Sequence, residues 1–189
     1  MKQRCGWVKK GDKVYEDYHD YEWGKPLHVE KDLFELFSLE TQAAGLSWLT
    51  VLKKREGYRE AFCGFDLECV ANLTCKDETR ILESGLVIKS LPKIKAIINN
   101  AKLFLYVKKE FGSLDNYFWS YVNHKPIVNL LDSYKDGATT SDISDKLTKD
   151  LKKRGFKFVG SVTIYAFMQA CGMINEHEKS CWCANKFVK

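Results

Sequence analysis

Residues 30–52 have the sequence EKDLFELFSLETQAAGLSWLTVL, in which apolar side chains return at intervals of three and four residues. The positions that follow this spacing are Leu33, Phe34, Phe37, Ala44, Leu49 and Leu52. Such a spacing is the period of an amphipathic α-helix. The same criterion predicts helices over residues 55–63, 77–84, 92–110, 114–122, 141–153 and 161–172. Because no segment shows the strict alternation of a half-buried strand, the sequence predicts an all-α fold.

The length and composition indicate a globular protein. The 189 residues fit a single domain over 1–189, or two small lobes. With 45% hydrophobic residues and only 3 Pro and 12 Gly, a disordered or collagen-like chain is excluded. No apolar run approaches the ~20 residues of a membrane span, and the first residues lead into no apolar signal core. We therefore expect a cytoplasmic protein with no membrane partner.

Large aromatic side chains gather in the opening segment, up to about residue 28. Neither a helical nor a strand period fits them, so we expect this segment to be irregular. The rings are Trp7, Tyr15, Tyr18, Tyr21 and Trp23. So many large rings are not expected on a surface that has no function.

The formal charge of +5 is concentrated in one stretch. Residues 145–157 contain six basic and two acidic side chains, and a turn with Gly155 and Gly160 leads into an apolar helix. The free amides at the start of such a helix bind phosphate. The basic side chains that would add attraction to a nucleic-acid backbone are Lys152, Lys153, Arg154 and Lys157. The alternative is an amphipathic helix with a solvated lysine face.

The chain has seven cysteines, which cannot all pair with one another, and we expect it in the cytoplasm. A full disulfide framework is therefore not expected, and the candidates are metal ligands, a reactive thiol or buried thiols such as those of Cys63, Cys69, Cys75 and Cys171. Two Cys and two His make a tetrahedral zinc set. His177 and Cys181 stand four residues apart, and Cys5 and His19 flank the aromatic segment. This spacing alone is weak, because roughly one such pair arises by chance.

One carboxylate falls on the apolar stripe of the helix after residue 30. Glu40 lies seven residues after Leu33 and three after Phe37, so its side chain faces the interior or a cavity. A buried carboxylate is costly unless it is paired, so Glu40 is either a functional group or half of an internal salt bridge. Trp48, two turns further on, suits a pocket for a flat polar or cationic ligand, with core packing as its alternative.

Five ordered motifs span essentially the whole chain. They are RCGW (4–7), YHDYEWG (18–24), LETQAAGLSW (39–48), WSYVNH (119–124) and KKRGFKFVG (152–160). Together they closely resemble the bacterial DNA-3-methyladenine glycosylase I family. The resemblance implies an all-α fold of the helix-hairpin-helix glycosylase superfamily, with the hairpin at about 151–171. It also implies a structural Zn²⁺ ion that joins the N- and C-terminal segments.

The resemblance assigns roles to particular residues. The zinc ligands fall on Cys5, His19, His177 and Cys181. The base pocket falls on Glu40, Tyr18 and Trp48, with Trp7, Tyr15 and Trp23 around it, and Glu40 is the candidate catalytic residue. Two positions depart from the family pattern: Ala43 stands where members can have a second Gln, and Cys183 is a rival metal ligand.

The resemblance also implies the type of reaction. The superfamily's catalytic Asp is missing from residues 175–180, and Val162 stands near the point where bifunctional members have a nucleophilic Lys. We therefore expect a monofunctional DNA-repair hydrolase that acts as a monomer on alkylation-damaged double-stranded DNA. It would release free 3-methyladenine and leave an abasic site, with Glu40 acting mainly on the base.

Two other classes of protein compete with this prediction. A zinc-clipped DNA-binding module without catalysis would explain the basic stretch and the metal ligands, but not an inward carboxylate beside aromatic rings. A thiol redox enzyme is indicated only by Cys181-Trp182-Cys183, whose spacing is C-x-C rather than C-x-x-C.

Overall fold

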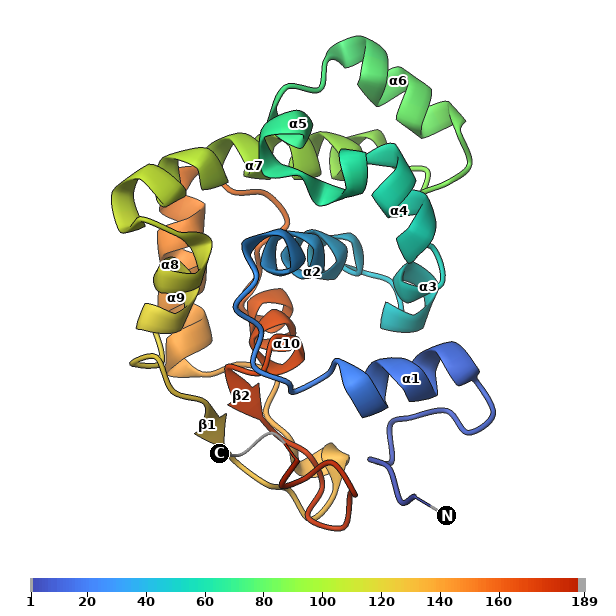
Figure 1. Ribbon diagram of the computed structural model, residues 1–189, viewed down its shortest axis with the longest axis vertical. Helices are drawn as coiled ribbons and strands as arrows, with labels where there is room; N and C mark the ends of the chain where they lie inside the picture. Colours follow the sequence, from blue (N-terminus) through green and yellow to red (C-terminus); the bar gives the residue numbers. More distant parts are fainter. Residues whose placement is uncertain (1, 187–189) are drawn as a thin grey trace.

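The computed structural model describes residues 2–186, which form ten α-helices, two short 3₁₀ helices and a two-stranded sheet (Figure 1). The α-helices are α1 (Lys13–Tyr21), α2 (Glu30–Gln42), α3 (Trp48–Leu52), α4 (Arg55–Ala61), α5 (Leu67–Ala71), α6 (Cys75–Glu83), α7 (Leu91–Phe111), α8 (Leu114–Ser120), α9 (Asp142–Arg154) and α10 (Ser161–Ala170). The remaining elements are η1 (Cys63–Phe65), η2 (Tyr134–Asp136), β1 (Ile127–Val128) and β2 (Ile174–Asn175). No helix among the described residues is both long enough and apolar enough to cross a membrane.

Two sequence-based expectations are corrected by the structure. The fold is mostly helical but not all-α, because β1 and β2 pair in parallel with Ile127 opposite Ile174. Strands of two residues are too short to show an alternating pattern. The opening segment is also less irregular than expected, since it contains α1, whose first turn is capped by the Asp12 side chain.

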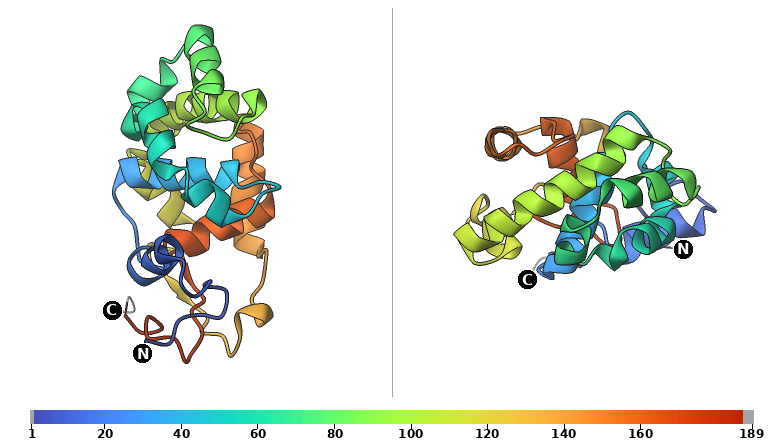
Figure 2. Two further views of the ribbon diagram at one scale, coloured as in Figure 1. Left: turned by 90° about the vertical axis from the view of Figure 1, so that its right-hand side faces the viewer. Right: turned by 90° about the horizontal axis from the view of Figure 1, so that it is seen from above.

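The centre of the molecule is α2, which lies between α7 and α10 (Figures 1 and 2). Its predicted apolar face is fully buried, with Leu33, Phe34 and Phe37 at 0% exposure. The Phe37 ring packs against Phe104 of α7 and Phe167 of α10, with ring centroids 4.9 and 5.4 Å away. This packing fixes the axis of the helix that carries Glu40.

The end of α2 is held by a buried lysine. Lys93, near the start of α7, donates from Nζ to the carbonyl oxygens of Gln42 and Ala44, at 2.6 and 2.8 Å. In return, the Gln42 amide donates to the carbonyl oxygen of Lys93 at 3.2 Å. These bonds satisfy carbonyl groups that a helix end leaves without partners, and they fix the loop that leads to Trp48.

The N- and C-terminal segments lie against each other at one end of the molecule (Figure 1). The amide of Gly6 donates to Glu178 at 3.0 Å, and the amide of Trp182 donates to the carbonyl of Gln3 at 2.9 Å. The pairing of β1 with β2 continues to Leu131, whose amide donates to the carbonyl of His177 at 3.0 Å. Residues 131–139 are thereby brought beside residues 176–178.

One disulfide is present among the described residues. Cys63 of η1 is bonded to Cys69 of α5, six residues further on. Of the other two cysteines named as candidate core thiols, Cys171 is buried and Cys75 is exposed. The expectation of buried thiols therefore holds for Cys171 and not for Cys75, which begins α6 on the surface.

Candidate active site

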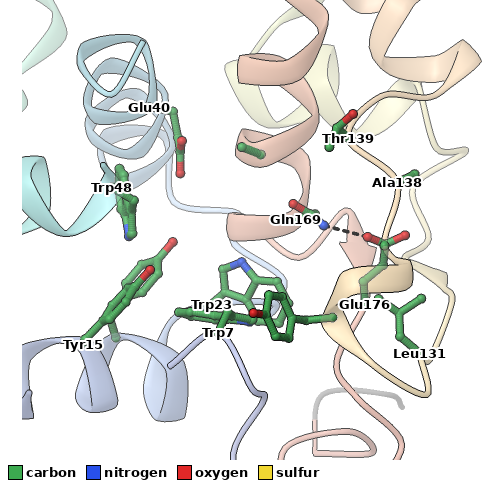
Figure 3. A pocket seen from close by; sticks show the side chains of 14 residues that line it. Trp7, Tyr15, Trp23, Glu40, Trp48, Leu131, Ala138, Thr139, Gln169 and Glu176 are labelled. Atoms are coloured by element: carbon green, nitrogen blue, oxygen red, sulfur yellow. Dashed lines mark hydrogen bonds between the residues drawn. The ribbon is translucent and has the colours of Figure 1, made fainter. Parts of the chain in front are cut away.

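A cavity of about 320 Å³ opens between α1, α2 and α3 on one side and α10 with residues 131–139 on the other (Figure 3). All six residues predicted for the base pocket line it. They are Trp7, Tyr15, Tyr18, Trp23, Glu40 and Trp48. The fold brings α1, α2 and α3 together because α3 packs against both α2 and α1.

The aromatic residues form a continuous wall. Trp7 contacts Tyr15 and Trp23 edge to face, each with ring centroids 5.1 Å apart, and Tyr18 lies 5.3 Å from Trp48. Trp48 is the first residue of α3, and the Ser47 side chain caps that helix. The buried indole N–H of Trp48 has no hydrogen-bond partner among the described residues. The wall therefore offers stacking surface and one free donor to a flat ligand.

Glu40 extends from α2 into the cavity (Figure 3). Its side chain is buried, and no ion pair within residues 2–186 includes it, so the alternative of an internal salt bridge is not realised. Burial raises the pKa of Glu40 to about 8. At neutral pH the carboxyl group is therefore largely protonated, and it can donate as well as accept a hydrogen bond.

A second carboxylate lies across the cavity, and sequence reasoning missed it. Glu176 follows β2 and is 5% exposed. It accepts hydrogen bonds from the Tyr165 hydroxyl at 2.7 Å and from the Gln169 amide at 2.6 Å. Gln169 stands three residues after Ala166 on α10, and both line the cavity. This helical spacing was the one local signal for Gln169, whereas nothing local indicates the direction of Glu176.

The four predicted zinc ligands lie together beside the cavity. The donor atoms of Cys5, His19, His177 and Cys181 are within 4.8 Å of one another, and all four residues are buried. Burial lowers the pKa of His177 to about 4, so its imidazole is neutral at pH 7. Cys183 is not in this group; its thiol lies near the carbonyl of Asp20, at 3.9 Å.

This group of four residues also supports the aromatic wall. The Trp23 ring packs on His177 with centroids 4.6 Å apart, and the Trp7 ring packs on His19 at 5.3 Å. The position of two cavity rings therefore depends on the position of the two histidines.

The predicted nucleic-acid contacts lie around the loop between α9 and α10. Lys152, Lys153 and Lys157 are exposed, and Gly160 precedes the first turn of α10. Arg154 is different, since its guanidinium is paired with Glu110 and with Asp150, the latter at 2.7 Å. No ion pair within residues 2–186 includes these three lysines, whereas the fourth cation, Arg154, is already engaged by carboxylates.

Comparisons with known proteins give matches over nearly the whole chain. The model of the methyladenine glycosylase family matches residues 7–184. A DNA-3-methyladenine glycosylase of Haemophilus influenzae is 46% identical over 183 residues, which are 97% of this chain and 98% of the relative. A crystal structure of a 3-methyladenine DNA glycosylase I superposes with a TM-score of 0.92 at 45% identity, covering 96% of this chain and 99% of the other. A variant of such an enzyme in complex with 3-methyladenine superposes with a TM-score of 0.91 at 42% identity, covering 95% and 96%.

The fold that holds this aromatic cavity and its buried carboxyl group is that of a DNA base-excision glycosylase. Within that class, the chain belongs to the methyladenine glycosylase family. The resemblance found in the five sequence motifs is thereby confirmed.

Proposed function

We propose that this protein hydrolyses the N-glycosidic bond of 3-methyladenine in alkylated double-stranded DNA, as a monomer in the cytoplasm. The observation that carries the proposal is the cavity in which Glu40 and Trp48 face a space large enough for one base. A base inside a duplex cannot reach such a cavity, so the damaged nucleotide must leave the stack, at a cost of a few kcal/mol. The products are free 3-methyladenine and an abasic site.

Recognition rests on the positive charge of the methylated base. Stacking a cationic ring on Trp48 adds roughly 0.5–2 kcal/mol that a neutral adenine lacks. A cation beside Glu40 also favours the ionised carboxylate, which then pairs with the base. The ring of Tyr18 packs beside Trp48, and Trp7, Tyr15 and Trp23 complete the wall.

The residues that line the cavity indicate hydrolysis rather than strand cleavage. None of them is a lysine, and Val162 is 59% exposed at the start of α10. The cavity therefore offers no lysine amine that could form a Schiff base with the sugar. Water is the nucleophile, and the good leaving group supplies much of the rate.

Release of the free base tests this function. Duplex DNA treated with a methylating agent is incubated with the protein, and the released bases are separated and quantified. We expect 3-methyladenine to be released and unmodified adenine to be retained, and a panel of other methylated bases measures selectivity. Intact binding without any released base would instead identify a DNA-binding module.

The Glu40→Gln variant tests how Glu40 acts. If Glu40 acts mainly on the base, affinity for free 3-methyladenine and the single-turnover rate at subsaturating protein fall together, because ground-state and transition-state binding are lost alike. The rate at saturating protein then changes little. A loss of many orders of magnitude in rate with unchanged base affinity would contradict this role.

We further assign DNA binding to the helix-hairpin-helix formed by α9, the loop 155–160 and α10. Lys152, Lys153 and Lys157 supply charge, and no described side chain caps the amides after Gly160, as suits an anion-binding helix start. Arg154 remains a prediction, although its pairing with Glu110 and Asp150 favours a structural role.

A structural Zn²⁺ fits the four residues that join the two ends of the chain. The Nδ1 atoms of both histidines already contact side-chain oxygens, Asp20 for His19 at 2.9 Å and Asn175 for His177 at 2.8 Å. The Nε2 atom of His19 lies 3.5 Å from the Cys181 thiol. Histidines of metal sites are oriented by neighbouring oxygens in this way. Cys5, His19, His177 and Cys181 would fill all four positions of a tetrahedral ion, so the metal would stabilise the fold and take no part in catalysis.

A further inference from the structure

Glu176 lies on the wall of the cavity opposite Glu40 (Figure 3). Each of its carboxylate oxygens accepts one hydrogen bond from a side chain of α10, Tyr165 on one and Gln169 on the other. The carboxylate is therefore held in one orientation by the helix that follows the DNA-binding loop. Such fixed orientation is what a group must have to act on a developing charge.

The two hydrogen bonds to Glu176 fix the orientation of its carboxylate but do not neutralise its charge. Two other buried acids of this protein are paired with cations: Glu35 with Arg55 and Arg59, and Asp20 with Arg4. Both partners of Glu176 are neutral, and no lysine or arginine among residues 2–186 forms an ion pair with it. A buried negative charge without a cation is costly, so its presence beside a ligand cavity points to a cation that arrives with the ligand.

The reaction requires such a charge on the sugar side. As the C1′–N9 bond breaks, N9 keeps the electron pair, the base leaves neutral, and positive charge develops on the deoxyribose. The oxygen of water then bonds to C1′, and its proton is lost to solvent. A group that contacts only the base, as proposed for Glu40, stabilises the charge of the substrate and not that of the transition state.

The placement of α10 indicates which wall faces the sugar. Its first turn lies at the DNA-binding loop, and further along the same helix Ala166 and Gln169 line the cavity. A nucleotide with its phosphate at the loop and its base against Glu40 and Trp48 would therefore place its sugar along the α10 wall. Building on the proposed glycosylase function, we propose that Glu176 is a second catalytic carboxylate, which stabilises the positive charge on the deoxyribose.

Single-turnover release of 3-methyladenine by the Glu176→Gln variant tests this proposal. Gln keeps the shape and removes the charge, so we expect the rate to fall by about 10²–10³, the loss typical of one oriented electrostatic group. Affinity for free 3-methyladenine, followed by tryptophan fluorescence, is expected to stay within about twofold, because the free base carries no sugar.

The matched control is Glu178→Gln, two residues away. Glu178 is also buried, but it accepts from the backbone amides of Gly6 and Tyr134 and does not line the cavity. We expect it to lower the unfolding midpoint with less than about a tenfold loss of rate. If it slows release as much as Glu176→Gln does, the effect is a local disturbance and the proposal is overturned.

Two further outcomes decide the matter. Glu176→Gln with nearly the wild-type rate overturns the proposal, and so does an equal loss of rate and free-base affinity, which would place Glu176 on the base. Should Glu176→Gln fail to fold, Tyr165→Phe removes one of the two orienting bonds, and we expect a smaller loss of rate, roughly tenfold, with free-base affinity kept. A wild-type protein that releases no base would refute the proposed function itself, a result distinct from all of these.

Discussion

Two buried glutamates of α2 have different roles because different side chains surround them. Glu35 and Glu40 are both less than a tenth exposed and lie on the same helix. Glu35 accepts hydrogen bonds from Arg55 and Arg59 of α4, which makes it a link between two helices. Glu40 has no such partner and opens into the cavity. The cost of burying Glu40 is therefore not compensated in the free protein, and the proposed binding of a cationic base would compensate it.

This difference predicts opposite effects on stability. The folded pKa of Glu40, about 8, lies above its ordinary value of 4.5, so its stabilising contribution is complete below about pH 4.5 and is lost as the pH rises toward 8. Glu40→Gln does not titrate, so we expect it to be more stable than wild type at pH 7–8, by on the order of a few kcal/mol. Denaturant unfolding of both proteins from about pH 5 to pH 9 measures the difference.

The comparison is strengthened by Glu35→Gln. This change removes the buried carboxylate that Arg55 and Arg59 share, and it is expected to destabilise the fold at every pH in that range. A Glu40→Gln protein that is less stable than wild type at pH 8 would show that Glu40 has a stabilising partner after all.

At the scale of elements, the helices that bury one apolar face could be predicted from sequence, and the contacts between distant segments could not. The period of three and four residues located α2, α7, α9 and α10 closely. It did not reveal α1, in which Tyr15 and Tyr18 face a cavity rather than the core. Glu176 was missed because its direction depends on the pairing of β1 with β2, which joins segments 47 residues apart, Ile127 with Ile174.

Lys93 is a second element-scale contact with a measurable role. It bonds two carbonyl oxygens at the end of α2, and this joins the helix of Glu40 to the loop before Trp48. We expect Lys93→Met to destabilise the fold by about 1–3 kcal/mol and to weaken binding of free 3-methyladenine. Denaturant unfolding and fluorescence titration measure the two effects. The control is Lys102→Met, on the same helix but exposed, for which no effect beyond about 0.5 kcal/mol is expected.

At the scale of the whole molecule, both ends of the chain contribute residues that support one wall of the cavity. Cys5 and His19 come from the N-terminal segment, and His177 and Cys181 from the C-terminal segment. The rings of Trp7 and Trp23 pack on the two histidines. The sequence contained all four residues, yet their spacing alone could not separate them from chance pairs, because proximity arises only after folding.

Metal removal is therefore expected to affect both stability and the site. If chelation removes about 3 kcal/mol of stability, the unfolding midpoint falls by roughly 6–12 °C for a chain of this size. We also expect weaker binding of free 3-methyladenine, since Trp7 and Trp23 lose their support. Metal analysis distinguishes the ligands: Cys181→Ala is expected to lose the zinc, and Cys183→Ala to keep one ion per chain. Freshly purified protein without zinc would contradict the assignment.

The distribution of charge over the whole molecule leads to a prediction about its contact with DNA. Most of the net +5 lies in residues 145–157. Arg154 is engaged there by two carboxylates, whereas no ion pair of the described residues includes Lys152 or Lys153. Each phosphate contact contributes about 0.9 to the slope of log affinity against log salt concentration. We therefore expect Lys152→Ala and Lys153→Ala each to reduce that slope by about one, and Lys146→Ala, at the far end of α9, to leave it unchanged.

Arg154→Ala is expected to lower the unfolding midpoint while leaving the slope unchanged, because its guanidinium already pairs with Glu110 and Asp150. Binding of a duplex over a series of salt concentrations tests all four variants, and a reduced slope for Arg154→Ala would place that guanidinium on the DNA as well.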